Sequence, residues 1–424
     1  MSGQTPRHIA IVGSGPSGCF VAQALKRQWP DADVTIFDRL AAPYGLIRYG
    51  VAADHQHTKS ITRQFDRSFQ AGDYRFAGNV EVGADVTLDE LRDAFDLVVL
   101  ATGRWRDRML SVPGSRLAGV IPSGDIINAL NSVPRPALPM PEIGKQVVVV
   151  GAGNVAIDMV RFLIKDASDY DGSDVNPVAL EQYLSEPATK ITVLSRSPIA
   201  TAKADVAMIR ELAKVPGVTF SYANSSPAAD DNKLGKKRED AFAQLAELEV
   251  DQPRAHVHFI FGADPARVLG TTHVTGIQLA AAPAGQASEV EADTIISAIG
   301  FDVNAPGHWH YATDIDFSPS DLGFVEPGLY RSGWLKRGPV GAIPANRADS
   351  VDVAKEIVRD FEKGKLPIDS SKQGFPALPD SVHERAISYT EWQRIDAAEQ
   401  EAAPANRIRK KFPDHESMVR AAKR

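Results

Sequence analysis

The chain has 424 residues, more than one hydrophobic core usually contains, so we expect at least two domains. Its 47 basic and 54 acidic residues give a formal net charge of −7, which argues against non-specific nucleic-acid binding. No apolar run is long enough for a membrane helix, and the single cysteine, Cys19, excludes a disulfide framework, a CxxC redox pair and a cysteine metal cluster. We expect no metal site, no membrane insertion and a cytoplasmic location.

A glycine-rich turn at the start of the chain predicts a first nucleotide-binding unit. The apolar residues 9–12 fit a buried parallel strand, three glycines follow at G-x-G-x-x-G spacing, and a helical pattern then begins. These glycines would permit a tight turn, the approach of a pyrophosphate and close packing of helix on strand. The alternative interpretation is a tight strand-to-helix turn that binds no ligand. The next strand, 34–37, ends in an acid that suits ribose hydroxyls. The candidate residues are Gly13, Gly15, Pro16, Gly18 and Asp38.

The following segment mixes loops with short elements. Residues 42–55 contain two glycines and a proline, which predict an irregular loop. The patterns beyond it predict a helix over 61–69, a short strand at 80–82, a helix at 88–94 and a buried strand at 97–100. Ala101 and Gly103 follow that strand, where a nucleotide-binding sheet closes over its ligand, so we add both to the first site.

A second nucleotide-binding unit begins at residue 146. A strand over 146–150 precedes a G-x-G-x-x-A turn and a helix. The next strand, 191–194, is followed by Ser195 and Arg196. An acid at this position would favour the ribose of NAD, whereas an arginine suits the 2′-phosphate of NADP. We therefore expect FAD in the first unit and NADP(H) in the second, with an inactive duplicate as the alternative. The candidates here are Gly153, Asn154, Val155 and Arg196.

The remaining elements complete the two units. The patterns predict strands at 257–261, 274–279 and 294–296, an irregular loop at 333–346, a helix through 351–361 ended by Gly364, and a last helix around Trp392 capped by Ser388 or Thr390. Residues 297–301 resemble 101–103, as expected for two related sheets between which the chain crosses. The predicted fold class is α/β, with two Rossmann-like, doubly wound, three-layer nucleotide-binding domains in a glutathione-reductase-like layout.

Four distant segments together resemble the adrenodoxin-reductase-type ferredoxin–NADP reductases, including their bacterial members. The segments are 43–55, 151–158, 333–341 and 392–399, and the resemblance extends over nearly the whole chain. It implies an FAD domain made of residues 1–107 and 306–424 and an NADP domain of residues 108–305. The implied reaction passes hydride from NADPH to FAD and then single electrons to an iron–sulfur ferredoxin, acidic and of the 2Fe–2S or a similar type.

The resemblance also implies roles for residues outside the glycine turns. Around the flavin ring it implies Tyr44, Gly45, Leu46 and Val51 on one side and Trp334, Gly341, Ala342 and Ile343 on the other. A helix beyond Asn346 would point its N-terminus at the ring edge that gains negative charge. His55 and Glu211 would lie at the nicotinamide as orienting and shielding residues, since hydride transfer needs no general base. For His55 the alternatives are a surface histidine or, with His57, an adventitious metal pair.

The sequence departs from the family pattern at three places. Ser195 stands where an arginine is common, the spacing from Arg196 to Glu211 is one residue longer, and Pro344 replaces a glycine. The first departure weakens the preference for NADPH over NADH, although we still expect NADPH to be preferred. Basic residues that could dock an acidic ferredoxin are Arg210, Lys214 and the cluster Lys233, Lys236, Lys237 and Arg238. For that cluster the alternative is a solvated charged loop.

Other functions fit the residues less well. A disulfide reductase would need a second cysteine. A monooxygenase or amine oxidase would account less simply for the presence of two nucleotide-binding units. An NAD(P)H-oxidising subunit similar to the glutamate-synthase small subunit, and a non-enzymatic nucleotide sensor, stay as alternatives. The sequence leaves open which ferredoxin is reduced and whether the protein is a monomer or a dimer.

Overall fold

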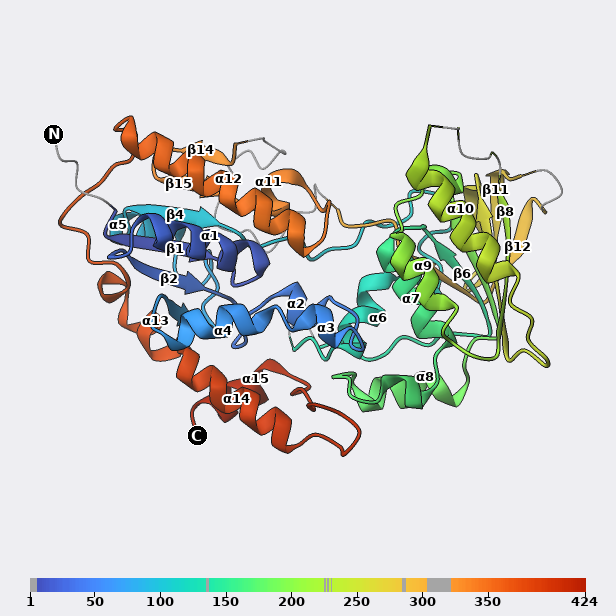
Figure 1. Ribbon diagram of the computed structural model, residues 1–424. Helices are drawn as coiled ribbons and strands as arrows, with labels where there is room; N and C mark the ends of the chain where they lie inside the picture. Colours follow the sequence, from blue (N-terminus) through green and yellow to red (C-terminus); the bar gives the residue numbers. More distant parts are fainter. Residues whose placement is uncertain are drawn as a thin grey trace.

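The structure is a computed structural model that describes residues 6–134, 137–224, 226, 229, 231–283, 287–302 and 322–424. Figure 1 shows two bodies side by side, the first built from both ends of the chain and the second from its middle. Each body contains a six-stranded sheet with helices against it. The confirmed fold class is therefore the predicted α/β arrangement of two nucleotide-binding sheets. The predicted domain limit between residues 305 and 306 lies outside the described residues.

The first sheet has the strand order β14-β15-β4-β1-β2-β3 and is parallel except for β14, which pairs antiparallel with β15. One face of β1 and β4 packs on helices α1 and α12, and the other face packs on α5. Because both faces are covered, β4 and residues 9–12 of β1 are apolar and buried. The elements are β1 (His8–Val12), α1 (Pro16–Gln28), β2 (Asp33–Phe37), β3 (Arg75–Ala77), α5 (Leu88–Ala94), β4 (Leu97–Leu100), β14 (Phe324–Glu326), β15 (Leu329–Arg331) and α12 (Ile343–Glu362).

The second sheet has the order β5-β13-β6-β7-β9-β8 and is parallel throughout. A three-stranded antiparallel sheet, β10-β11-β12, packs on one face, and helices cover the other. The strands are β5 (Val120–Pro122), β6 (Gln146–Val150), β7 (Lys190–Ser195), β8 (Val218–Asn224), β9 (Ala255–Phe261), β10 (Asp264–Gly270), β11 (Val274–Ala281), β12 (Glu289–Glu291) and β13 (Thr294–Ser297). The helices are α6 (Ser123–Leu130), α7 (Asn154–Ile164), η1 (Ala167–Tyr170), α8 (Pro177–Ser185), η2 (Ile199–Thr201), α9 (Val206–Leu212) and α10 (Lys233–Ala246).

The remaining helices surround the first sheet. They are α2 (Leu46–Tyr49), α3 (Gln56–Lys59), α4 (Thr62–Gln70), α11 (Trp334–Arg337), η3 (Phe375–Ala377), α13 (Asp380–Arg385), α14 (Tyr389–Glu401) and α15 (His415–Ala422). The capping box predicted for α14 is confirmed, because Ser388 and Glu391 bond to each other's backbone N–H groups. Gly364, just beyond α12, has a φ of 68°, as expected of a glycine that ends a helix.

Four predictions of local structure were wrong. Residues 80–82 form no strand, since Val82 makes only an isolated bridge to Val86, and the edge strand is β3 instead. Residues 42–55 contain the short helix α2, because Gly45 and Gly50 flank its ends and do not interrupt it. The segment 333–346 contains α11 and the first turn of α12, and α15 follows the helix that was expected to be last.

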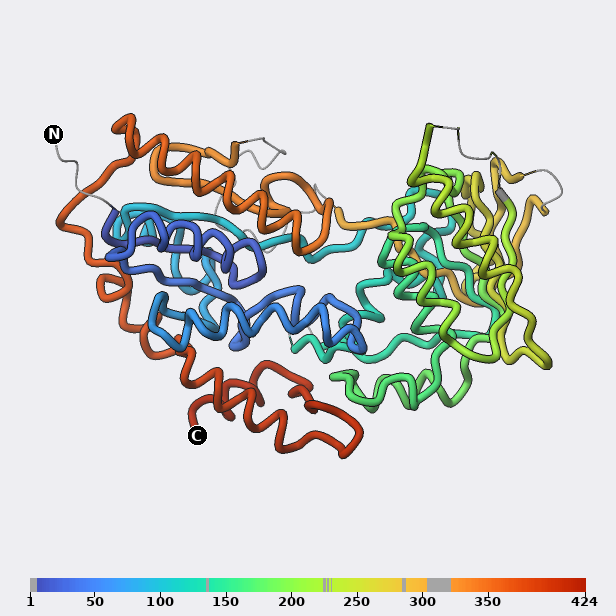
Figure 2. Tube along the Cα trace, in the orientation of Figure 1, coloured from blue at the N-terminus to red at the C-terminus, as the bar shows by residue number. Residues whose placement is uncertain are grey.

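The chain crosses between the two bodies twice, and the crossings pair with each other (Figure 2). The amide of Arg108 donates to the carbonyl of Gly300, and the amide of Asp302 donates to the carbonyl of Arg106, both at 2.8 Å. The connection is therefore a short antiparallel ribbon that limits the bending of either crossing alone.

A C-terminal segment, residues 404–411, forms a second connection. The amide of Gly172, in the middle part of the chain, donates to the carbonyl of Asn406 at 2.9 Å, and the amide of Ile408 donates to the carbonyl of Ser173 at 3.0 Å. This segment thus links the helices around the first sheet to the second body (Figure 1).

Beneath that segment lies a buried charged cluster. The carboxylate of Asp174 accepts hydrogen bonds from the ammonium groups of Lys59 at 2.8 Å and Lys411 at 2.9 Å. Both ammonium groups also donate to the side-chain oxygen of Asn131 and to the carbonyl of Arg48. The Asp174 and Lys411 side chains are only 4% and 1% exposed. Burial alone would raise the pKa of Asp174, but the two ammonium groups outweigh burial and hold this pKa well below its usual range.

Candidate functional site

A cleft of about 2560 Å³ lies between the two bodies, which is more than twice the volume of a usual single-ligand pocket. It is lined by the carboxyl ends of strands from both sheets and by the segments that cross between them. This is where open α/β sheets bind ligands. The candidate residues that line it are Gly13, Gly15, Pro16, Asp38, Gly45, Leu46, Val51, His55, Ala101, Gly103, Gly153, Asn154, Val155, Arg196, Glu211, Trp334, Gly341, Ala342 and Ile343.

The first glycine turn has the geometry that a dinucleotide pyrophosphate needs. Gly13 has a φ of +108°, and a Cβ there would lie 2.6 Å from the carbonyl oxygen of Ala101. A Cβ on Gly18 would lie 1.9 Å from the carbonyl oxygen of Gly13, so this glycine serves helix packing, and it is the one glycine of the motif that does not line the cleft. A Cβ on Gly15 would meet no atom within 4 Å and would only occupy cleft space. The turn therefore fits a phosphate group at Gly15.

Asp38 lies at the end of β2 and faces the same space. Its carboxylate accepts hydrogen bonds from the backbone N–H of Ser14 at 3.0 Å and from that of Leu40 at 2.9 Å. Burial raises the pKa of Asp38, and the hydrogen bonds from Ser14 and Leu40 oppose that rise. The carboxylate is thus held in place by the turn, as a group that receives ribose hydroxyls requires.

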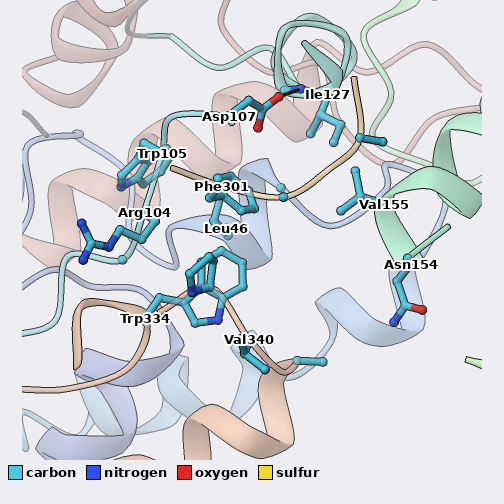
Figure 3. A pocket seen from close by; sticks show the side chains of 18 of the residues that line it. Leu46, Arg104, Trp105, Asp107, Ile127, Asn154, Val155, Phe301, Trp334 and Val340 are labelled. Atoms are coloured by element: carbon cyan, nitrogen blue, oxygen red, sulfur yellow. Dashed lines mark hydrogen bonds between the residues drawn. The ribbon is translucent and has the colours of Figure 1, made fainter. Parts of the chain in front are cut away.

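Aromatic side chains gather in the middle of the cleft. Phe301, at the second crossing, lies 5.1 Å from the ring of Trp334, and Leu46 lies beside them (Figure 3). Helix α12 begins at Ile343 and not beyond Asn346, because Pro344 occupies one of the first two helical positions, where no N–H is needed. The N-terminus of α12 therefore reaches the cleft at Ala342 and Ile343.

Tyr44 does not line the cleft, contrary to the expectation. Its backbone has a φ of 82° and its side chain is buried. The hydroxyl donates to the carboxylate of Asp66, which also accepts a hydrogen bond from Tyr389 at 2.6 Å. The side chain therefore fastens the neighbouring loop to α4 and α14.

The second glycine turn repeats the geometry of the first. Gly151 has a φ of +125°, and a Cβ there would lie 2.3 Å from the carbonyl oxygen of Ala298. Gly153 is open toward the cleft, since a Cβ added to it would lie 3.9 Å from its nearest neighbour, the Cβ of Lys203. Asn154 begins α7, and its amide nitrogen donates to Asp205 at 2.7 Å. Two matching turns thus face one cleft.

His55 and Glu211 are brought together from the two bodies. His55 Nε2 lies 3.2 Å from Glu211 Oε2, and His55 Nδ1 lies 3.8 Å from Asp158. The guanidinium of Arg161 contacts Glu211 at 3.4 Å, Asp158 at 2.9 Å and also Asp54. The side chains of one helix, α7, therefore hold both His55 and its partner in place.

Comparison with known proteins agrees with this geometry. The family described as pyridine nucleotide-disulphide oxidoreductase matches residues 7–313. Cindoxin reductase of Citrobacter braakii is 40% identical, over 98% of this chain and 91% of that protein. The mitochondrial NADPH:adrenodoxin oxidoreductase of Salvelinus fontinalis is 30% identical, over 98% and 91%. The structure of Mycobacterium tuberculosis FprA in complex with NADPH has a TM-score of 0.88 and 28% identity, covering 99% of this chain and 100% of that one.

The chain belongs to the adrenodoxin-reductase-type ferredoxin–NADP reductases. Within the broader disulphide oxidoreductase family, this reductase has a single cysteine, so it lacks the dithiol that disulfide exchange requires. No helix in the described ranges is both long and apolar enough to cross a bilayer.

The ion pairs around His55 in this reductase were missed by the sequence analysis. Asp158 and Arg161 are three residues apart on one face of α7, a spacing that was available as a signal. The contacts of Arg161 and Lys165 with Asp54 join segments far apart in the chain and had no local signal. Burial would raise the pKa of Asp54, but Arg161 and Lys165 outweigh burial and lower it.

The thiol of Cys19 is expected to be unreactive in the native reductase. Its side chain is fully buried on α1, and burial, with the nearby carboxylates of Asp38 and Asp66, raises the pKa of the thiol. A thiol reagent such as Ellman's reagent should detect no thiol in the native protein and one after denaturation. Rapid labelling of the native protein would contradict the described packing.

Proposed function

We propose that this chain is a ferredoxin–NADP⁺ reductase that passes hydride from NADPH to FAD and then single electrons to an iron–sulfur ferredoxin. The observation that carries the proposal is a single cleft with a dinucleotide-type glycine turn on each wall. Asp38 lines this cleft on the first body, and Arg196 lines it on the second. FAD, when bound, supplies the conversion between a two-electron donor and a one-electron acceptor. The relative named for adrenodoxin supports an iron–sulfur partner.

We assign the FAD site to residues of the first body. The open backbone at Gly15 and the start of α1 would receive the pyrophosphate, and the Asp38 carboxylate would accept hydrogen bonds from ribose hydroxyls. Backbone N–H groups at Ala342 and Ile343 would stabilise negative charge at the edge of the ring. The remaining cleft candidates named above would line the ring.

We assign the NADP site to the second body. Gly153, Asn154 and Val155 would hold the pyrophosphate, and Arg196 the 2′-phosphate. His55, positioned by Glu211, would orient the nicotinamide carboxamide and exclude water. No residue is required to move a proton in this step. Exposed cations on and after α9, Arg210 and Lys214, would meet an acidic ferredoxin, preferably of the 2Fe–2S type.

The proposal is tested with the purified protein. It should be yellow, NADPH should bleach it under anaerobic conditions, and added ferredoxin should allow cytochrome c reduction. Ferredoxins from the same organism, assayed in parallel with NADPH and NADH, identify the preferred pair. A protein that retains no flavin after reconstitution would refute the proposal.

Glu211→Gln is expected to slow flavin reduction by NADPH without loss of FAD. The substitution keeps a hydrogen-bonding group for His55 but removes the charge that faces Arg161, and one charge-assisted hydrogen bond is worth about 1.5 kcal/mol or roughly tenfold in rate. Stopped-flow absorbance of the flavin measures the rate. Glu181→Gln, at an exposed position on α8, is the control and should leave the rate unchanged. An unchanged rate in Glu211→Gln would remove Glu211 from this role.

A further inference from the structure

The loop after β7 presents too little positive charge for a 2′-phosphate. Such a phosphate carries a charge of about −1.5 to −2 at neutral pH. Arg196 is exposed and lines the cleft, whereas the hydroxyl of Ser195 is already engaged, donating to the carbonyl of Ser197 at 2.8 Å. A single arginine neutralises only part of the phosphate charge, so a second cation should face the same loop.

Helix α10 supplies that cation. Its first turn packs closely on η2, because Asn232 donates to the carbonyl of Ala200 and a Cβ on Gly235 would lie 2.9 Å from the Ala200 side chain. Further along the helix, Arg238 donates from Nε to the carbonyl of Ala204 and from Nη1 to the carbonyl of Ala200, both at 3.0 Å. The guanidinium is therefore fixed against the loop before any ligand binds.

Arg238 keeps its charge available to a ligand. Both of its hydrogen-bond acceptors are neutral carbonyls, and no carboxylate pairs with it within the described part of the chain. It is half-buried and lines the same cleft as Arg196, whereas the neighbouring Lys237 is exposed and does not line the cleft. Arg238 thus differs from the surface cluster to which the sequence analysis assigned it.

Lys203 adds a third cation to this wall. It is exposed, lines the cleft and lies beside Gly153 at the pyrophosphate turn. The nearby carboxylate of Asp205 accepts a hydrogen bond from Asn154, which holds it at the start of α9. The cleft wall formed by η2 and α10 therefore carries a net positive charge.

Resting on the proposed function, we propose that Arg238 is a specificity residue that binds the 2′-phosphate of NADP(H) together with Arg196, with Lys203 contributing charge nearby. Arg238 compensates for the short, neutral side chain at Ser195. The contact is made by an arginine from a different helix, pre-positioned by two backbone carbonyls, so it selects NADPH over NADH without touching the reacting atoms.

The test compares two adenine nucleotides binding to the FAD-loaded protein by calorimetry. Adenosine 2′,5′-bisphosphate carries the 2′-phosphate, and AMP lacks it. Arg238→Gln should weaken binding of the bisphosphate about tenfold, the loss expected for one charge-assisted hydrogen bond, and leave AMP binding unchanged. In turnover, the KM for NADPH should rise while kcat and the KM for NADH stay constant. Lys237→Gln is the matched control and should leave the affinity for both nucleotides unchanged.

Arg238→Lys separates charge from loop structure. It keeps a cation but loses the two fixed hydrogen bonds, so it should recover part of the bisphosphate affinity. Equal weakening of AMP and bisphosphate in Arg238→Gln, or no change in either, would overturn the proposal. Equal affinity of the unaltered protein for the two nucleotides would overturn this proposal and the NADP specificity in the proposed function together. If only the Arg238 variants lose the preference for the bisphosphate over AMP, both this proposal and the proposed function are supported.

Discussion

Asp174→Asn is expected to lower the free energy of unfolding by about 3–5 kcal/mol, the usual cost of leaving a buried charge without its partner. The substitution removes the only carboxylate that contacts the ammonium groups of Lys59 and Lys411 in the described structure, and both of these side chains are buried. Chemical denaturation followed by tryptophan and flavin fluorescence measures the loss.

The pH dependence of this loss has a definite sign. The folded pKa of Asp174 is lowered, so its contribution is present above the unfolded pKa of about 3.9 and disappears as the pH falls below that value. The difference between the variant and the unaltered protein should be constant from about pH 5 to 8 and shrink below about pH 4. Asp352→Asn is the control, because Asp352 and Lys355 form a pair that is 68% exposed on both sides. Equal losses in the two variants would contradict the buried cluster.

Gly15→Ala is expected to yield a folded protein that has lost most of its FAD. The backbone at Gly15, with φ −68° and ψ −178°, suits alanine, and the new methyl group would touch no protein atom. It would instead occupy the space through which the pyrophosphate approaches the backbone, so the affinity for FAD should fall by at least tenfold, or about 1.4 kcal/mol. Circular dichroism measures folding, and the flavin absorbance per chain measures FAD.

Two further glycine variants make this test specific. Gly153→Ala alters the equivalent open position of the second turn, so it should keep FAD and lose affinity for NADPH. Gly18→Ala should fail to fold, since its methyl group would lie 1.9 Å from a backbone oxygen. Full FAD retention in Gly15→Ala would show that the pyrophosphate lies elsewhere.

The glycine turns and the acid after β2 were predictable because each acts on neighbours in the chain or on the adjacent strand. Gly13 contacts the end of β4, and Ser14 contacts Asp38, so the motif carries its own geometry. The meeting of His55 with Glu211 followed from the family resemblance, and the structure adds the Arg161 contacts that hold them. The roles of these residues toward their ligands stay predictions.

The buried cluster around Asp174 could not be predicted, because its members come from four separate segments and show no periodic pattern. The early start of α12 had a local signal in Pro344, which is common in the first turn of helices. Residues 80–82 were mistaken for a strand because a short apolar run indicates burial without specifying a hydrogen-bonded partner.

The place of β4 in the first sheet has a consequence for synthesis on the ribosome. One edge of β4 pairs with β1, which precedes it, but the other pairs with β15, which is translated only after the entire second body. A nascent chain therefore carries an apolar, unpaired strand edge while residues 120–297 emerge and fold. That edge of the growing polypeptide needs shielding from other chains until β15 emerges.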